Sequence, residues 1–202
     1  QKRISSPEEA SLIIKDGMTV AFGGYTSSGY PKVIASELVK RKKAGANLQL
    51  FVLSGSAIGP IEDVMGEVGI IARRAPMIES RVLAKSANNG GVSYVEQQMN
   101  KMPRLLRSGA FGKVDVAVVE AIGLTEEGYI IPTSSVGMLP NLLELAETVI
   151  VEINLAQPAE LRGLHDIYFP EFTQTPKPIP FTNVNQRIGE PYIKVDPAKI
   201  SY

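Results

Sequence analysis

The sequence predicts an α/β protein with a Rossmann-like, doubly wound and mostly parallel sheet. Apolar runs of strand length, rich in β-branched residues, recur along the chain, and helical segments lie between them. Glycine- and serine-rich loops follow the first two of these runs. Near-continuous apolar strands that alternate with helices are typical of a parallel sheet covered on both faces.

The first predicted helix has Ser6 as its N-cap, with proline at its first position, and it ends before Gly17. Residues 18–22 then read as a strand, which leads into the glycine- and serine-rich loop 23–30. Pro31 is expected to open the next helix, since proline suits the first helical turn.

Three further strands are predicted over 48–53, 114–121 and 148–154, and a helix over 139–147 precedes the last of them. The first of these strands leads into the loop 54–60. In open parallel sheets, ligands bind beyond the carboxyl ends of the strands. The loops that follow the predicted strands are therefore the places to search for a site.

Composition excludes several classes of function. The 202 residues carry 21 Lys and Arg against 21 Asp and Glu, so the basic surplus of a typical nucleic-acid-binding protein is missing. With no cysteine and a single histidine, His165, the chain lacks thiolate and multi-histidine metal sites, and we expect no metal. No apolar run approaches the roughly 20 residues of a membrane span, so we expect neither nucleic acid nor membrane as a partner.

The chain divides into two parts by composition. Residues 1–156 carry the alternating strands and helices and are expected to form one α/β domain. Residues 157–202 begin with a proline-rich stretch, expected to be extended, and contain a strand-like piece over 187–197.

Two phosphate-binding motifs fail on their residues. Gly24 to Gly29 has the G-x-x-x-x-G spacing of a phosphate loop, but Tyr30 and Pro31 stand where lysine and a hydroxyl residue are needed. No G-x-G-x-x-G follows a predicted strand, which argues against a dinucleotide enzyme. The loop's glycines and hydroxyls still suit an anionic or carbonyl ligand, although a ligand-free strand-to-helix turn explains them equally well.

Three single residues have both a chemical and a structural interpretation. Glu120, at a strand end, is a candidate nucleophile or base, or a carboxylate that holds loop amides. His165 favours a structural role, because Asp166 is its direct neighbour rather than a partner placed to orient the ring. Arg187 is a candidate to bind a substrate carboxylate through its guanidinium, or else it forms an ordinary ion pair.

Several segments, in order along the chain, resemble the acetyl-CoA hydrolase/transferase family. Residues 24–32 are similar to its G-F-T-x-x-G-Y-P-K loop. Residues 119–137 resemble its V-E-A, T-E-D-G and P-T-S-S-V-G elements, residues 163–167 its G-x-H-D-I, and residues 186–200 its R-x-G and P-x-K-I stretch. The chain thus resembles the N-terminal domain of this family, which includes succinyl-CoA:acetate CoA-transferases.

The resemblance implies the CoA-transferase fold and an acyl-CoA:carboxylate CoA-transferase or an acetyl-CoA hydrolase, with a coenzyme A thioester and acetate or succinate as substrates. In this family a glutamate of the second half attacks the thioester, so no catalytic residue is expected in this chain, and the isolated chain is expected to be inactive. The resemblance implies that residues 157–202 lead toward a C-terminal catalytic domain of the same protein, outside this chain. That domain and further copies in a homo-oligomer are the implied partners. The implied compartment is the cytoplasm, or the mitochondrion in a eukaryote.

The resemblance also assigns site residues. The expected substrate-binding residues are Gly24, Tyr25, Thr26, Ser27, Ser28, Gly29, Tyr30, Pro31, Lys32, Ser56 and Arg187. The expected residues of a structural loop are Glu120, Pro132, Thr133, Ser134 and Ser135. The loop 54–60 resembles the family's G-A-S-x-G-P, but Ala57 stands where many members have serine, and Ser56 is one place earlier. This departure bears on substrate choice.

Two other functions compete with this interpretation. The same fold could serve as a non-catalytic binding or assembly module. A sugar-phosphate isomerase on a related fold would need an acid/base carboxylate and several basic phosphate ligands at loop tips, which this sequence supplies poorly.

Overall fold

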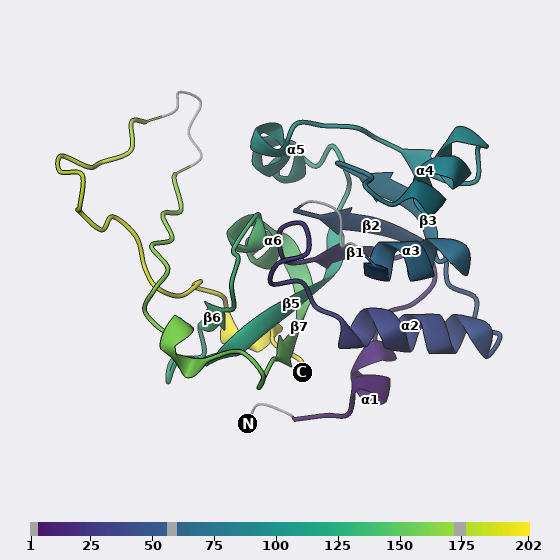
Figure 1. Cartoon of the computed structure of the whole chain (residues 1–202), viewed down its shortest axis with the longest axis horizontal. Helices are drawn as coiled ribbons and strands as arrows, with labels where there is room; N and C mark the ends of the chain where they lie inside the picture. Colours follow the sequence, from purple (N-terminus) through teal and green to yellow (C-terminus); the bar gives the residue numbers. More distant parts are fainter. Residues whose placement is uncertain (1–3, 56–59, 172–176) are drawn as a thin grey trace.

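The structure is a computed structural model that describes residues 4–55, 60–171 and 177–202. Within these residues, one sheet of seven strands runs through the molecule in the order β4-β3-β2-β1-β5-β6, and β7 also pairs with β5 (Figure 1). All pairs are parallel except β5 with β6. The strands are β1 (Thr19–Phe22), β2 (Leu50–Ser54), β3 (Ile71–Ala75), β4 (Ser93–Tyr94), β5 (Val114–Leu124), β6 (Ile130–Pro132) and β7 (Ala146–Ile153).

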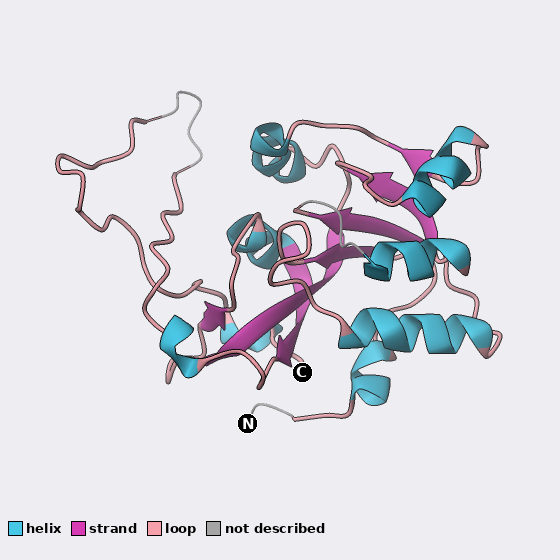
Figure 2. Ribbon diagram, viewed as in Figure 1, coloured by secondary structure: helices cyan, strands magenta, loops and turns pink. Residues whose placement is uncertain are grey.

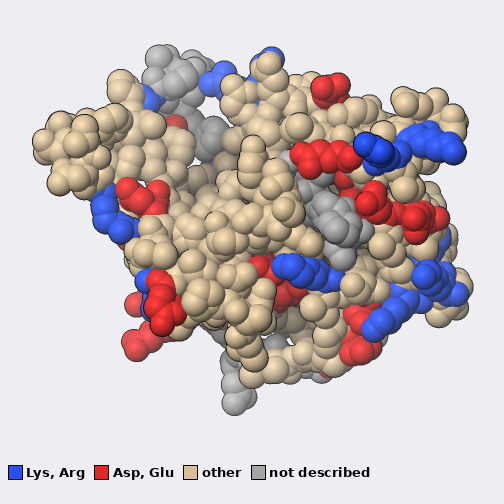
Figure 3. Space-filling model, in the orientation of Figure 1, with Lys and Arg blue, Asp and Glu red and all other residues tan. Residues whose placement is uncertain are grey.

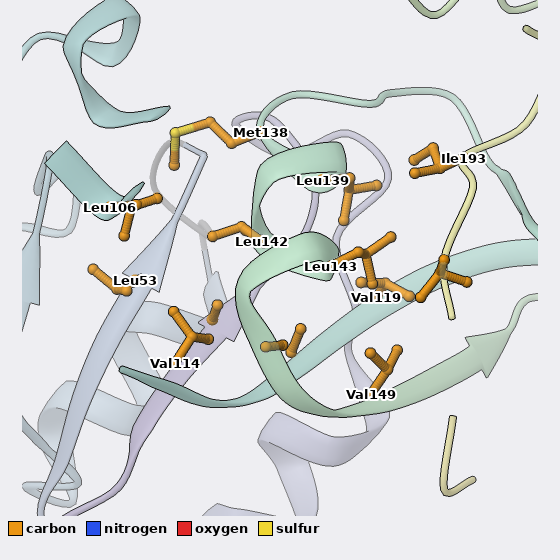
Figure 4. Close-up of a cluster of buried hydrophobic side chains, with 14 of the residues drawn as sticks. Leu53, Leu106, Val114, Val119, Met138, Leu139, Leu142, Leu143, Val149 and Ile193 are labelled. Carbon is orange, nitrogen blue, oxygen red and sulfur yellow. The ribbon is translucent and has the colours of Figure 1, made fainter. Parts of the chain in front are cut away.

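Helices pack on both faces of this sheet (Figure 2). One apolar core lies between the sheet and α1 to α4, and the other lies between the sheet and α5 and α6. Figure 4 shows the second core, in which Leu139 and Leu143 of α6 pack near Val119 of β5. The helices are α1 (Pro7–Ser11), α2 (Val33–Lys43), α3 (Pro60–Glu67), α4 (Arg81–Asn88), α5 (Met102–Arg107) and α6 (Leu139–Leu145). The predicted doubly wound α/β fold is confirmed.

The predicted elements are present with shifted ends. The helix expected from Ser6 is correctly capped, its hydroxyl accepting the Glu9 N–H at 3.2 Å, but α1 ends at Ser11. The helix after the glycine-rich loop begins at Val33 and not at Pro31. The strand expected over 114–121 continues as β5 to Leu124, because its last residues pair with β6.

The sequence did not reveal β3, because two arginines interrupt its apolar pattern. Arg74 is fully buried in β3. Its Nε lies 2.5 Å from Oε1 of Glu62 on α3, and its Nη2 donates to Ser54 Oγ at 2.7 Å. A guanidinium with these partners can occupy a core position that would otherwise need an apolar residue.

The second part of the chain adds little regular structure. Much of the described chain between residues 168 and 187 projects away from the sheet (Figure 1), and the described residues of 157–187 contain one short 3-10 helix, Ala159–Leu161. The prediction of a strand-like piece over 187–197 was wrong. Residues 187–197 form no regular strand and make isolated bridges, Glu190 with Ile167 and Ile193 with Ile130. A second 3-10 helix, Pro197–Lys199, follows.

The last residues of the chain lie along the free edge of β7. Ser201 donates its N–H to the Val149 carbonyl at 3.1 Å, and Val151 donates to the Tyr202 carbonyl at 2.9 Å.

Among the described residues, no helix combines the length and the apolar character that crossing a bilayer requires.

Candidate functional site

The glycine-rich loop after β1 lies beside the loop after β6. The Oγ atoms of Ser28 and Ser134 are 2.8 Å apart, and Ser135 Oγ donates to the Ser28 carbonyl at 2.7 Å. β6 runs antiparallel to β5, with Pro132 opposite Ala121, so the end of β6 lies beside the last part of β5. Segments more than 100 residues apart in the sequence therefore meet near the carboxyl ends of β1 and β5.

The tip of the loop after β1 is a tight turn. Tyr25 and Ser28 exchange two backbone hydrogen bonds, each of 2.9 Å. Thr26 has φ 51° and is the one non-glycine residue with positive φ in the described chain. Such a conformation costs about 1–3 kcal/mol for a residue of this kind and persists when the surroundings fix it. Tyr25 and Ser27 are exposed at this tip, and Thr26 is half-buried.

Close packing of neighbouring loops explains the glycines. A Cβ on Gly29, at φ +60°, would lie 2.6 Å from Ser135 Oγ. A Cβ on Gly55, which follows β2, would lie 2.6 Å from the carbonyl oxygen of Gly24. The glycines thus serve loop packing, and the exposed hydroxyls at the turn tip are left as the groups that face outward.

Glu120 is the centre of a polar cluster beneath this loop. Its carboxylate is buried and lies 2.5 Å from the Lys32 ammonium. Thr133 Oγ1 donates to it at 2.9 Å and Asn154 Nδ2 at 3.2 Å. The Lys32 ammonium also donates to the Tyr30 carbonyl at 2.8 Å and lies 4.3 Å from the Tyr30 ring centroid. The described partners of this carboxylate are side chains, so the interpretation that Glu120 holds loop amides was wrong.

The loop amides are held by Glu152 of β7, which sequence reasoning missed. Its Oε2 accepts the N–H groups of Lys32 at 2.8 Å and Val33 at 3.0 Å, and its Oε1 accepts the Ile34 N–H at 2.7 Å. Burial raises the pKa of Glu152; the three N–H donors act in the opposite direction, and the nearby charge of Glu120 adds to the rise. The available signal was the position of Glu152 near the end of the strand predicted over 148–154, since a position at a strand end is what singles out Glu120 in the sequence.

Arg187 binds main-chain carbonyls. Its Nη2 donates to the Gly163 carbonyl at 3.0 Å and also to the His165 carbonyl. The carboxylate of Asp166 accepts the Gly189 N–H at 2.6 Å, which ties the segments 163–167 and 187–190 together. The predicted carboxylate contact of Arg187 stays a prediction.

His165 links this pair of segments to the loop after β6. Its Nε2 lies 2.5 Å from the Thr133 carbonyl, and because a carbonyl only accepts, the ring N–H donates there. This contact agrees with the structural role expected for His165. Of the other expected residues, Pro31 and Pro132 are buried and Ser134 is exposed, whereas Ser56 lies outside the described residues.

Charges of both signs are interspersed over the face of the molecule that Figure 3 shows. The described part of the site is likewise mixed: the Lys32 ammonium pairs with the Glu120 carboxylate, and the Lys32 backbone N–H donates to the Glu152 carboxylate.

Comparison with known proteins identifies the family. The model of the acetyl-CoA hydrolase/transferase N-terminal domain matches residues 1–201. The chain belongs to this family. The resemblance carried by the loop 24–32 and the later segments is thereby confirmed.

Curated relatives show how much of a longer protein this domain represents. A succinyl-CoA:acetate CoA-transferase of Clostridium kluyveri is 36% identical over 202 residues, covering 99% of this chain and 38% of the relative. An acetyl-CoA hydrolase of Schizosaccharomyces pombe is 36% identical over 215 residues, covering 99% and 40%. The chain therefore spans well under half the length of these relatives.

Solved structures show the same fold at low sequence identity. Glutaconate coenzyme A-transferase from Acidaminococcus fermentans superposes with a TM-score of 0.58 at 14% identity, over 73% of this chain and 65% of that one. At this identity the likeness concerns the fold alone.

Proposed function

We propose that this chain is the N-terminal part of an enzyme that transfers coenzyme A between an acyl group and a carboxylate, or hydrolyses the acyl-CoA. The loop 24–32 forms a wall of the acyl and acceptor pocket. The observation that carries the proposal is the family match over residues 1–201, joined to the position of this loop at the carboxyl edge of the parallel sheet.

The nucleophile comes from outside this chain. Both described carboxylates beneath the loop are engaged: Glu120 with an ammonium and two further side-chain donors, Glu152 with three backbone amides. A carboxylate bound in this way is a weaker nucleophile, because the hydrogen bonds that stabilise its charge must be given up when it attacks a carbonyl. The curated relatives extend well beyond the matched region, which leaves ample chain to supply a reactive glutamate.

The chemistry proceeds by exchange at that glutamate. Its carboxylate attacks the thioester carbonyl, the C–S bond breaks, and the CoA thiolate leaves a mixed acyl-glutamyl anhydride. The thiolate then attacks the glutamyl carbonyl and releases the acyl group as a carboxylate. An acceptor carboxylate takes the place of the first acyl group in the reverse sequence, or water hydrolyses the intermediate. The present chain contributes by shaping the pocket, and the exposed hydroxyl of Ser27 at its rim can donate to a substrate oxygen.

An assembly module is the second candidate, because the projecting segment exposes apolar side chains. Leu164 is 67% exposed, Phe181 56% and Val184 fully exposed. Apolar side chains gathered on a segment with little regular structure are typical of a contact surface.

The test uses the full-length protein in which this chain occurs. CoA transfer from succinyl-CoA to acetate and release of free CoA are measured together, with and without acetate. We expect transfer or hydrolysis by the full-length protein and neither by residues 1–202 alone. Arg187→Gln is expected to raise the KM for acetate, whereas the exposed Arg162→Gln is the matched control. Activity of the isolated chain would contradict the placement of the nucleophile; a full-length protein without either activity would favour the assembly module.

A further inference from the structure

Glu120 and Glu152 lie side by side on neighbouring strands. They are register partners in the parallel pair of β5 and β7. Paired residues of adjacent strands point to the same face of a sheet, about 5 Å apart. Two carboxylates so close together in a buried setting need compensating donors.

Both carboxylates act on Lys32. Glu120 binds its ammonium at 2.5 Å, and Glu152 binds its backbone N–H at 2.8 Å. Glu152 also binds the next two amides, which open α2. Lys32 is the last residue of the loop 24–32 and directly precedes α2, and its side chain makes no capping hydrogen bond. The carboxylate from β7 replaces that cap, so the end of the loop is fixed by the sheet rather than by local sequence.

We infer that Glu152 is a positioning residue for substrate binding, which acts by clamping Lys32 and the end of the loop 24–32 against the sheet. The inference rests on the proposed function of this loop. In the described part of the chain, the hydrogen bonds of Glu152 go to the amides of residues 32–34 and not to the turn 25–28, so Glu152 acts on the turn only through the position of Lys32. Without it, the amides of Lys32, Val33 and Ile34 lose their acceptor, and Lys32 keeps only the contacts that its side chain makes with Glu120 and Tyr30.

A graded pair of substitutions in the full-length protein tests the clamp. Glu152→Gln keeps a carbonyl oxygen that can serve Lys32 and Val33 and loses the acceptor for Ile34, whereas Glu152→Ala loses all three bonds. Glu147→Gln is the matched control, because Glu147 lies on the same strand, is exposed, and contacts only Lys113 among the described bonds.

We expect the KM for acetate to rise about tenfold in Glu152→Gln and further in Glu152→Ala, with kcat within about twofold, because a displaced loop weakens binding rather than the chemical step. Glu147→Gln should match the wild type. A merely structural role would lower the active fraction, which reduces apparent kcat and leaves KM unchanged. Backbone hydrogen exchange at residues 32–34 should accelerate in Glu152→Gln and not in Glu147→Gln.

The outcomes separate the two proposals. An active wild-type protein whose Glu152→Gln variant keeps the wild-type KM overturns the clamp and leaves the proposed function intact. A wild-type protein that neither transfers nor hydrolyses overturns the proposed function, and the positioning role with it. A raised KM together with faster exchange at residues 32–34 supports both.

Discussion

Replacement of Arg74 by methionine should destabilise the protein strongly, and a second substitution should restore most of the loss. Arg74 and Glu62 are both completely buried, with Nε and Oε1 2.5 Å apart. Arg74→Met removes the cation and leaves the Glu62 carboxylate in the core without its counter-charge. Breaking a buried pair in this way costs about 3–5 kcal/mol.

The structure indicates that the pair itself adds little net stability. Oε2 of Glu62 has no hydrogen-bond partner among the described residues, so the carboxylate is incompletely compensated even in the native state. Replacing both partners by apolar side chains of similar volume is often neutral or stabilising. Ser54 loses its hydrogen bond from Arg74 both in Arg74→Met and in the double variant, which costs about 1 kcal/mol of unfolding free energy. This loss cancels when those two variants are compared.

Urea denaturation of the wild type, Arg74→Met, Glu62→Leu and the double variant provides the assay. We expect the double variant Arg74→Met/Glu62→Leu to exceed Arg74→Met in unfolding free energy by about 3 kcal/mol. Additive effects of the two single substitutions would refute this reasoning, because they would mean that neither charge depends on the other.

Three further predictions concern the site. Gly29→Ala should lower the unfolding free energy by about 2–4 kcal/mol, because it adds left-handed backbone strain and places a Cβ only 2.6 Å from a serine oxygen of the neighbouring loop. Gly69→Ala is the control: Gly69 has φ +68° and open space around it, so this variant should show the cost of backbone strain alone. Equal losses of unfolding free energy in the two variants would contradict the steric argument. Lys32→Met should cost about 2 kcal/mol in thermal or urea unfolding, because it leaves the buried carboxylate of Glu120 without its cation, and no loss would contradict the ion pair. The pKa of Glu152 is raised above its ordinary value of 4.5, so the folded protein binds the carboxyl proton more tightly than the unfolded chain does. The unfolding free energy of the wild type minus that of Glu152→Gln should therefore fall as pH rises above 4.5, and it should level off once the carboxyl of the folded protein is ionised. A difference that rises with pH would contradict the direction of the pKa shift.

Periodicity and loop composition were sufficient to predict the architecture. The apolar runs that became β1, β2 and the first eight residues of β5 are buried throughout, as expected of strands covered on both faces of a sheet. β7 is predicted by the same apolar pattern, although some of its residues are exposed. β3 escaped detection for the opposite reason. The charge of Arg74 is compensated by Glu62, a partner 12 residues away that no local pattern relates to it.

The sequence by itself determined the fold class, the glycine-rich loop after the first strand and the family to which the chain belongs, because each is written in contiguous residues. Only the tertiary structure decided how the loop is held. Glu152 lies 120 residues after Lys32, and the two meet because β7 pairs with β5 beside β1. Hydrogen bonds between distant segments depend on strand order and register, which are settled by the packing of the whole sheet, so no contiguous stretch of sequence relates Lys32 to Glu152.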